Sequence, residues 1–148
     1  LAPALHAANN STLHAVASRD TERSAALNPT RIHKRYEDLL DDPEIDAVYI
    51  NLINEAHYQW SIAALAAGKH VLCEKPLGCS LEQSRSMVAA AKASGVANMV
   101  GFNYIRTPAS QQIKKFLKED HLSKIKFALT KQNQHLNTYP YITKTLKK

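Results

Sequence analysis

The chain has 148 residues, 45% hydrophobic and 22% charged, with a formal net charge of +6. This length is sufficient for one globular domain with a buried core. No apolar run reaches the roughly 18 residues that a membrane-spanning helix needs, so we expect no membrane partner.

The net positive charge is confined to the end of the chain. Residues 1–123 contain 13 basic and 13 acidic residues, and the excess comes from six lysines after Ser123. A basic tail without interleaved aromatic residues does not indicate a nucleic-acid module, so we expect no nucleic-acid partner.

The cysteines and the first residues exclude two further classes. Cys73 and Cys79 are not spaced as a CxxC pair and lie apart from the histidines, which argues against a disulfide framework or a metal site. The start, Leu1 to His6, lacks the basic and apolar segments of a secretory signal. We therefore expect reduced thiols in a cytoplasmic protein.

The first third of the chain predicts short alternating elements. Leu1, Leu5 and Ala8 have helical spacing, so a helix is expected at the very start. Asp20 is a suitable N-cap, and Asn28-Pro29 ends the helix that it begins. The elements that follow the first helix are a strand at 13–17, a helix at 20–26, a strand at 32–36 and a helical turn at 37–41.

The middle of the chain gives clearer signals. The apolar run 47–52 is typical of a strand buried on both faces. Asn54 can cap the next helix, and Gly68 follows its last turn. Ser80 and Gln83 have the spacing of a capping box. The further elements are a helix at 55–67, a strand at 70–73, a helix at 81–94, a strand at 97–102, a helix from Thr107-Pro108 and a strand at 125–129.

Strands alternating with helices in this way predict an α/β fold with a doubly wound parallel sheet of the Rossmann type. Such a fold begins with a strand and a Gly-rich turn before the first helix. No GxGxxG motif occurs, and the chain has only four glycines. We therefore expect the first strand to be missing, leaving 13–17 and 47–52 without their common neighbour, in a chain truncated at both ends.

The segment Glu74-Lys75-Pro76 is the strongest candidate for a functional site. The strand at 70–73 delivers a carboxylate and an amine to its own carboxyl end, where open α/β sheets bind ligands. The alternative is an exposed ion pair after a strand. The tripeptide and the preceding Gly68-Lys69-His70-Val71 resemble the active-site motif of the Gfo/Idh/MocA oxidoreductase family, and the resemblance extends over about residues 1–125.

The resemblance implies that Lys75 is the catalytic acid/base of a nicotinamide-dependent dehydrogenase and also contacts substrate. It implies that Glu74 lies beside the nicotinamide ribose and that Glu74, Lys75 and Pro76 help to frame the cofactor. Oxidation of an alcohol needs a base for the hydroxyl proton while a hydride leaves. Burial and a nearby cationic cofactor ring would favour the neutral amine that can act as this base.

Residues after the strand at 13–17 correspond to the segment that selects the cofactor in this family. An acidic residue at the strand tip binds the ribose hydroxyls of NAD, whereas an arginine accommodates the 2′-phosphate of NADP. Ser18 and Arg19 occupy the tip, which favours NADP over NAD. Alternatively, Arg19 is a solvated loop residue and Asp20 is only an N-cap.

The loop after the strand at 47–52 resembles a second cofactor-binding segment. Leu52, Asn54 and His57 are implied cofactor contacts, although the family's proline is replaced here by Ile53. Helix capping by Asn54 and His57 is an equally good and compatible interpretation.

The segment 100–108 resembles the family's sixth strand and its exit toward a second domain. Asn103 matches a position near the nicotinamide, and Arg106 matches one that faces substrate, although Arg106 could instead be a pairing partner near the helix start. We predict a partial NAD(P)-binding domain at 1–106 and the start of a substrate and oligomerisation domain at 107–148.

The resemblance thus implies hydride transfer between nicotinamide and a hydroxyl or carbonyl group of a sugar, polyol or related cyclic substrate. It also implies that the intact protein is a homo-oligomer. Two alternatives remain open: a dinucleotide-binding regulator without turnover, and an inactive fragment that binds NAD(P) weakly because the Gly-rich turn is missing.

Overall fold

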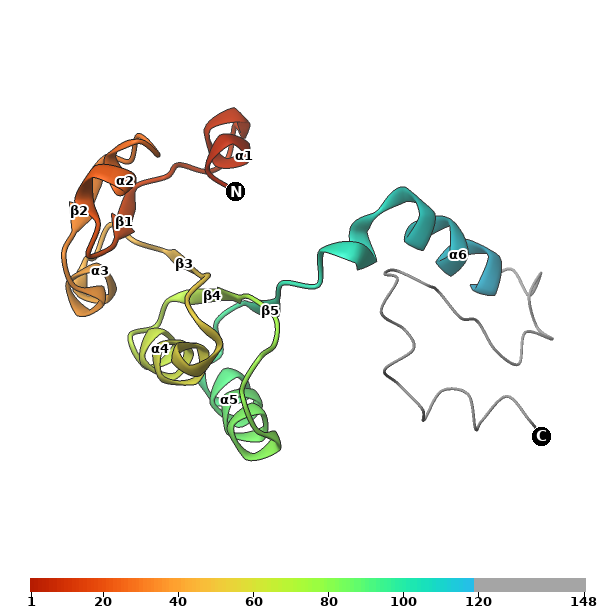
Figure 1. The fold of residues 1–148 in the computed structure, drawn as a ribbon. Helices are drawn as coiled ribbons and strands as arrows, with labels where there is room; N and C mark the ends of the chain where they lie inside the picture. Colours follow the sequence, from red (N-terminus) through yellow and green to blue (C-terminus); the bar gives the residue numbers. More distant parts are fainter. Residues whose placement is uncertain (119–148) are drawn as a thin grey trace, which may run out of the picture. The chain divides into compact units, whose positions relative to one another are not determined.

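The computed structural model describes residues 1–118, in which helices and strands alternate (Figure 1). Their bounds in chain order are α1 (Ala2–Ala7), β1 (Ala15–Ala17), α2 (Thr21–Ala25), β2 (Arg31–His33), α3 (Tyr36–Asp41), β3 (Ala47–Ile50), α4 (Asn54–Ala66), β4 (His70–Cys73), α5 (Leu81–Ser94), β5 (Asn98–Val100), the 3₁₀ helix η1 (Asn103–Arg106) and α6 (Pro108–Lys118). The strand predicted at 125–129 lies outside the described residues.

Contacts divide the chain into two units, Leu1–Asn103 and Tyr104–Lys148. The first unit contains all of the strands in the described part of the chain. It also contains the segment Glu74-Lys75-Pro76. The domain boundary predicted at residue 106 stays a prediction.

The strands of the first unit form two parallel sheets. β1 pairs with β2, and β3, β4 and β5 form a second sheet in that order. The predicted parallel α/β fold is therefore confirmed. Among the described strands, β1 and β3 share no neighbour, as expected for a Rossmann strand order in which one strand belongs between them.

Several strands are shorter than the apolar runs that predicted them. β3 ends at Ile50 rather than Leu52, because its partner β4 ends at Cys73, which is in register with Ile50. β5 likewise ends at Val100, opposite Cys73. A strand extends only as far as its neighbour continues the ladder of hydrogen bonds, and this limit is not visible in the apolar run itself.

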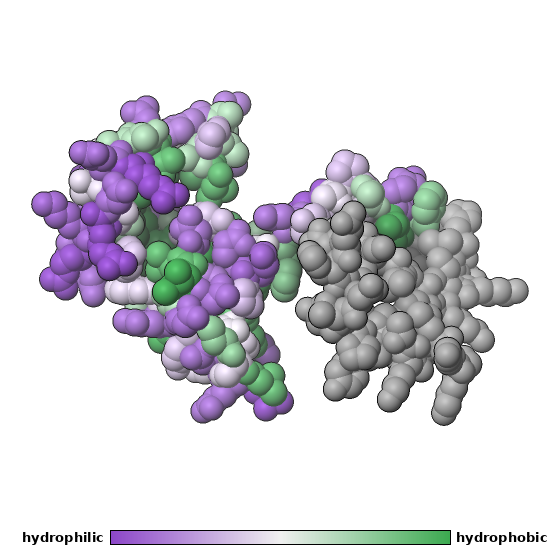
Figure 2. Space-filling view, in the orientation of Figure 1, coloured by the Kyte–Doolittle hydropathy of each residue, from purple (hydrophilic) through white to green (hydrophobic). Residues whose placement is uncertain are grey.

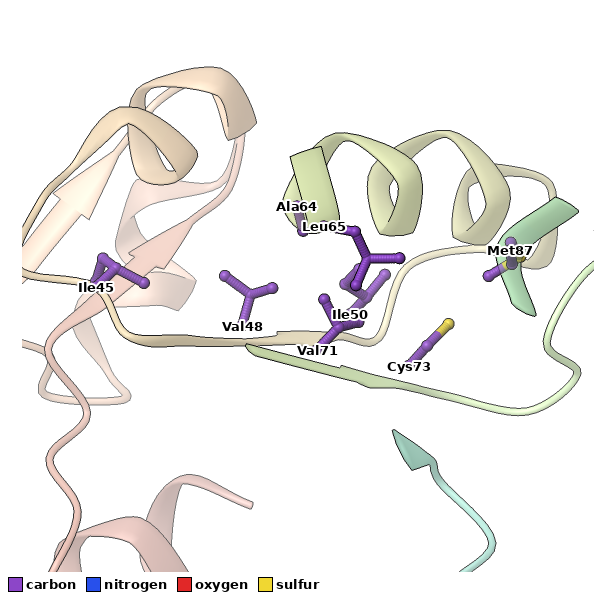
Figure 3. Packing of buried hydrophobic residues seen from close by; sticks show 8 residues of the cluster. All are labelled: Ile45, Val48, Ile50, Ala64, Leu65, Val71, Cys73 and Met87. Carbon is purple, nitrogen blue, oxygen red and sulfur yellow. The ribbon is translucent and has the colours of Figure 1, made fainter. Parts of the chain in front are cut away.

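The core lies on one face of the β3–β4–β5 sheet. Figure 3 shows Val48, Val71 and Cys73 pointing from the strands toward α4, whose Leu65 points back at them. Among residues 1–118, the eight buried apolar residues are Ile45, Val48, Ile50, Ala64, Leu65, Val71, Cys73 and Met87.

The prediction that the strand at 47–52 is buried on both faces was wrong. Along β3 and β4, buried residues alternate with more exposed ones. Tyr49 and Leu72 lie on the second face and are half-buried, and Met99 of β5, in register with Leu72, is 49% exposed. Helices α4 and α5 cover only the core face of this sheet. The continuous apolar run 47–52 therefore does not mean that the strand is buried on both faces.

The predicted helix caps are largely confirmed. The carboxylate of Asp20 accepts a hydrogen bond from the backbone N–H of Arg23 at 2.9 Å. The hydroxyl of Ser80 accepts one from the N–H of Gln83 at 3.1 Å. The reciprocal half of the capping box differs from the expectation, because the Gln83 side chain accepts from the N–H of Cys79 rather than of Ser80. The chain direction before α5 places that N–H within reach.

Polar contacts join the β1–β2 piece to the β3–β4–β5 piece. The buried carboxylate of Asp42, which follows α3, accepts hydrogen bonds from Arg31 at 2.7 Å and from the N–H of Glu44 at 3.0 Å, and it lies 3.2 Å from a ring nitrogen of His33. The Lys69 ammonium donates to the backbone carbonyls of Asp42 and Ile45. The connection between α3 and β3 is thus fixed from both sides.

Candidate active site

Three loops meet at the carboxyl edge of the second sheet. β3, β4 and β5 run parallel and end in register, so the segments 51–53, 74–76 and 101–103 leave the sheet side by side. Ligands of open α/β proteins bind at this edge, because loops converge there and helices begin nearby. The sequence-predicted residues Leu52, Glu74 and Asn103 each lie in one of these three segments.

The Glu74 carboxylate is held in a defined position across this edge. The Tyr49 hydroxyl donates a hydrogen bond of 2.6 Å to Oε1, and the backbone N–H of Lys75 donates one of 3.2 Å to Oε2. Gly101 provides the space: a Cβ at that position would lie 3.1 Å from the carboxylate. A side chain at position 101 would therefore press on the Glu74 carboxylate, which would have to move by a few tenths of an ångström.

These contacts keep Glu74 ionised and Tyr49 neutral. The hydrogen bond from Tyr49 holds the pKa of Glu74 below its ordinary value, and the N–H of Lys75 and the positive charges of Lys75 and His57 act in the same direction. Burial, followed by the hydrogen bond to Glu74, raises the pKa of Tyr49 to about 12. At neutral pH the pair is therefore a phenol donating to a carboxylate.

Lys75 directly follows the fixed carboxylate. Its side chain is exposed, and the peptide bond between Lys75 and Pro76 is cis. The expected burial of this amine is therefore not found among the described residues. The residue stands beyond the end of β4, where helices α4 and α5 do not cover it. The amine is accessible to a ligand at the carboxyl edge.

His57 is buried, with 1% of its surface exposed. Its Nδ1 lies 2.7 Å from the carbonyl oxygen of Pro76, and its Nε2 lies 3.0 Å from the carbonyl oxygen of Leu52. The ring thus spans the segments that follow β3 and β4. Its ring nitrogens contact carbonyl oxygens and not helix N–H groups, so the capping interpretation of His57 was wrong.

The start of α4 also differs from the expectation. The N-cap position is Ile53, which has no side-chain cap, and Asn54 is the first helical residue. The capping interpretation of Asn54 was therefore wrong by one position. Asn54 is exposed at the end of the helix that faces the carboxyl edge, and the Leu52 side chain packs partly buried against the core. The turn after β3 is one residue shorter than capping by Asn54 requires.

The tip of β1 carries Ser18 and Arg19. The Ser18 hydroxyl accepts a hydrogen bond of 3.1 Å from the N–H of Asp20, and Arg19 is exposed. The Asp20 carboxylate caps α2 through Arg23, which confirms its role as an N-cap. Arg19 is thus the accessible charged side chain directly after β1, in the piece of the sheet that does not contain Lys75.

Asn103 and Arg106 are the first and last residues of η1, and both are exposed. The N–H of Asn103 donates to the carbonyl of Gly101 at 3.1 Å, which turns the chain directly after β5. Asn103 belongs to the first unit and lies at the edge that carries Glu74, and Arg106 belongs to the second unit.

Two residues of the site are not identified by the sequence patterns. The patterns place Tyr49 only within an apolar strand, and Gly101 only within the next matching segment. Tyr49 is in register with Leu72, two residues before Glu74 on the same face, so its hydroxyl can reach the carboxylate. Once the parallel register of β3 and β4 is known, a tyrosine at this position indicates a hydrogen bond to the carboxylate of Glu74. Without the register, the alternation of residues along β3 gives no reason to choose Tyr49 as a site residue.

The described residues contain no cluster of three or more histidine, cysteine, aspartate or glutamate residues that could hold a metal ion. Within residues 1–118, no helix is long and apolar enough to cross a membrane. Both thiols are free; Cys73 is buried and Cys79 is exposed. Burial raises the pKa of the Cys73 thiol, so this sulfur is a neutral core group and not a nucleophile.

The carboxyl edge fits the nicotinamide end of a dinucleotide. Gly101 makes room for the fixed Glu74 carboxylate, which can accept a hydrogen bond from a ribose hydroxyl, and the amine of Lys75 is accessible next to it. A parallel α/β sheet with this arrangement defines the class of Rossmann-fold oxidoreductases. The family model Gfo/Idh/MocA, described as an oxidoreductase family with an NAD-binding Rossmann fold, matches residues 1–102. The chain belongs to this family.

Individual relatives agree with this assignment. Levoglucosan dehydrogenase of Pseudarthrobacter phenanthrenivorans is 44% identical over 87 residues, which cover 59% of this chain and 22% of that enzyme. Trans-1,2-dihydrobenzene-1,2-diol dehydrogenase of Xenopus laevis is 34% identical over 132 residues, which cover 85% of this chain and 39% of that protein.

Solved structures give the same result. A 3-ketoreductase from Actinomadura kijaniata in complex with NADP is 34% identical, with a TM-score of 0.72, over 80% of this chain and 39% of that one. The matched part of the chain thus corresponds to 22% to 39% of the length of these relatives.

Proposed function

We propose that the protein is an NAD(P)-dependent oxidoreductase that transfers a hydride between nicotinamide and a hydroxyl or carbonyl group of a sugar, polyol or related cyclic substrate. The observation that carries this proposal is the accessible Lys75 amine next to the Glu74 carboxylate, which Tyr49 holds in place at the carboxyl edge of the sheet. Membership of an oxidoreductase family supports the reaction class.

In this proposal Lys75 is the acid/base. During oxidation of an alcohol, its neutral amine accepts the hydroxyl proton, and during reduction of a carbonyl its ammonium returns a proton to the oxygen. When bound, the nicotinamide supplies the hydride acceptor or donor. Glu74 stays ionised throughout, so it stabilises the ammonium form of Lys75 and places a hydrogen-bond acceptor beside the cofactor ribose.

The remaining predicted residues surround the cofactor and substrate. Asn54 lies at the start of α4, and Pro76 and Asn103 lie in the segments after β4 and β5, at the edge where the nicotinamide would bind. Arg106 is proposed as a substrate contact. We further propose that the intact protein acts in the cytoplasm as a homo-oligomer.

The preferred cofactor in this proposal is NADP. Arg19 is exposed directly after β1, and the carboxylate of Asp20 is engaged through Oδ1 as the N-cap of α2, so the guanidinium is the first charged group after the strand. A guanidinium favours the 2′-phosphate of NADP over the free ribose hydroxyls of NAD. The comparison of kcat/KM for the two cofactors, before and after the substitution Arg19→Ala, measures this preference.

The decisive experiment compares Lys75→Ala with Lys92→Ala in the whole protein. Lys92 is an exposed lysine in the last turn of α5, at the opposite end of the sheet from Lys75. Loss of a general acid/base should lower kcat by about 10²- to 10⁴-fold, with cofactor affinity retained, while Lys92→Ala should keep the original kcat. Turnover with an unchanged kcat in Lys75→Ala would remove Lys75 from the mechanism.

A further inference from the structure

Both ring nitrogens of His57 lie at hydrogen-bond distance from groups that can only accept. Nδ1 is 2.7 Å from the carbonyl oxygen of Pro76, and Nε2 is 3.0 Å from the carbonyl oxygen of Leu52. A neutral imidazole has one N–H and one lone pair, whereas the imidazolium has two N–H groups. Only the doubly protonated ring can donate to both carbonyls.

The neutral alternative is unfavourable at this position. It would place a nitrogen lone pair against a carbonyl oxygen at 2.7 or 3.0 Å in a residue that is 1% exposed. A buried acceptor that faces another acceptor loses its hydrogen bond to water without a replacement. The two contacts of the imidazolium are charge-assisted, which makes each stronger than a neutral hydrogen bond.

We propose that His57 is a buried imidazolium that positions the site by donating one hydrogen bond to each of the two loops that follow β3 and β4. One bond fixes the carbonyl of Leu52, just before α4, and the other fixes the carbonyl of Pro76, directly after Lys75. The consequence for catalysis rests on the proposed function of Lys75. The bridge itself does not, because it is argued only from the contacts of the His57 ring with two backbone carbonyls.

The surroundings of the His57 ring contain groups that favour the imidazolium and groups that disfavour it. Burial of a cation and the nearby N-terminus of α4 disfavour the imidazolium. The carboxylate of Glu74 favours it, and the positive charge of His57 in turn contributes to the lowered pKa of Glu74. Lys75 lies beside the same carboxylate as a second positive charge. In this proposal, the two short contacts to carbonyl oxygens outweigh the unfavourable effects, so the His57 ring carries a proton on both nitrogens.

His70 provides an internal contrast. Its Nδ1 accepts a hydrogen bond of 2.9 Å from the backbone N–H of Ala97, so this nitrogen carries a lone pair and the ring is neutral in that arrangement. The same chain thus contains one histidine whose partners are acceptors and another whose partner is a donor. The two rings should differ in any measurement that reports protonation of the individual nitrogens.

The first test is long-range ¹H–¹⁵N NMR of the histidine rings in the ¹⁵N-labelled full chain at neutral pH. The variants His57→Gln and His70→Gln assign the two sets of signals by their disappearance. Both nitrogens of His57 should resonate in the region of protonated imidazole nitrogens, while one nitrogen of His70 should resonate in the unprotonated region. One unprotonated nitrogen in His57 would overturn the proposal.

The second test measures whether the ring connects the two loops. In His57→Gln, hydrogen exchange at the backbone amides of residues 52–54, of Lys75 and of residues 77–79 should become about tenfold faster or more, because both segments lose their fixed carbonyl. His70→Gln should leave both segments unchanged. Faster exchange in only one segment would overturn the bridge, and if His57→Gln does not fold, the ring spectrum of the unsubstituted chain still decides the protonation state.

Neither measurement requires cofactor or turnover, so the two proposals can fail separately. A doubly protonated His57 in a protein whose Lys75→Ala variant keeps its kcat would contradict only the proposed function. A neutral His57 in a protein that needs Lys75 would contradict only the imidazolium bridge.

Discussion

Residues 1–44 and 45–103 contain the same kind of unit, parallel strands joined by helices, yet only the second buries apolar side chains. All eight buried apolar residues lie between Ile45 and Met87, whereas the buried residues of the first part are Ser24 and Asp42, both polar. In the view of Figure 2, the surface over β2 and α3 is mainly hydrophilic. Hydrogen bonds and ion pairs hold this part to the rest, together with the partly buried Ala15, Leu39 and Leu40, which pack against the edge of the core.

Under the proposed function, this difference separates the residues proposed for proton transfer from those proposed to select the cofactor. Glu74, Lys75 and His57 stand on the well-packed part, while Ser18 and Arg19 stand on the part without an apolar core. Residues that must keep precise geometry for proton transfer need rigid support. Residues that select a cofactor phosphate through charge need less, because the attraction varies slowly with distance.

The largest effect that tests this comparison is expected from Leu65→Ala. Leu65 is 6% exposed and packs between α4 and the sheet, so its truncation leaves a cavity (Figure 3). The free energy of unfolding should fall by about 2–5 kcal/mol. Leu13→Ala, at a half-buried leucine before β1, is the matched variant and should lower it less. Equal losses in urea denaturation would contradict the assignment of the core to the second part.

A smaller effect is expected from Asp42→Asn, which tests the polar link. The hydrogen bond from the N–H of Glu44 and the contacts with Arg31 and His33 hold the pKa of Asp42 below its ordinary value. A carboxylate with a lowered pKa in the folded state contributes stability above its unfolded pKa, and this contribution is lost as the pH falls through the folded value. Asp42→Asn should therefore destabilise the protein at neutral pH.

The difference in stability between Asp42→Asn and the unsubstituted protein should become smaller in acid, below about pH 4. Thermal denaturation at a series of pH values measures this change. Asp41→Asn replaces the neighbouring exposed carboxylate and should change the melting temperature little at any pH. A destabilisation by Asp42→Asn that stays constant down to strongly acidic pH would show that the charge of Asp42 plays no part.

The smallest effect is expected from Tyr49→Phe, which removes one hydroxyl from the site. The hydrogen bond from Tyr49 is the largest contribution to the lowered pKa of Glu74, so this pKa should rise toward its ordinary value. An NMR titration of the Glu74 carboxyl group measures the shift. Tyr36→Phe, which alters a tyrosine that packs edge-on against Trp60, is the control and should leave the titration unchanged.

Much of this protein was predictable from local sequence. The spacing of apolar residues, the caps at Asp20 and Ser80 and the glycines after two helices predicted the order of elements within a few residues. The segment Glu74-Lys75-Pro76 was recognisable because a short buried strand must release its next residues at the carboxyl edge. These features depend on neighbours a few positions apart, which a sequence displays directly.

The tertiary structure decided which groups meet across the strands. The hydrogen bond from Tyr49 to Glu74 joins residues 25 positions apart, and the contact of His57 with Pro76 joins residues 19 positions apart. The parallel register sets both, and a one-residue slip would move Tyr49 to the other face of the sheet. The sequence by itself determined the order of the elements and the candidate motif Glu74-Lys75-Pro76; the alignment of the three strands determined how the carboxylate, the amine and the buried ring are arranged.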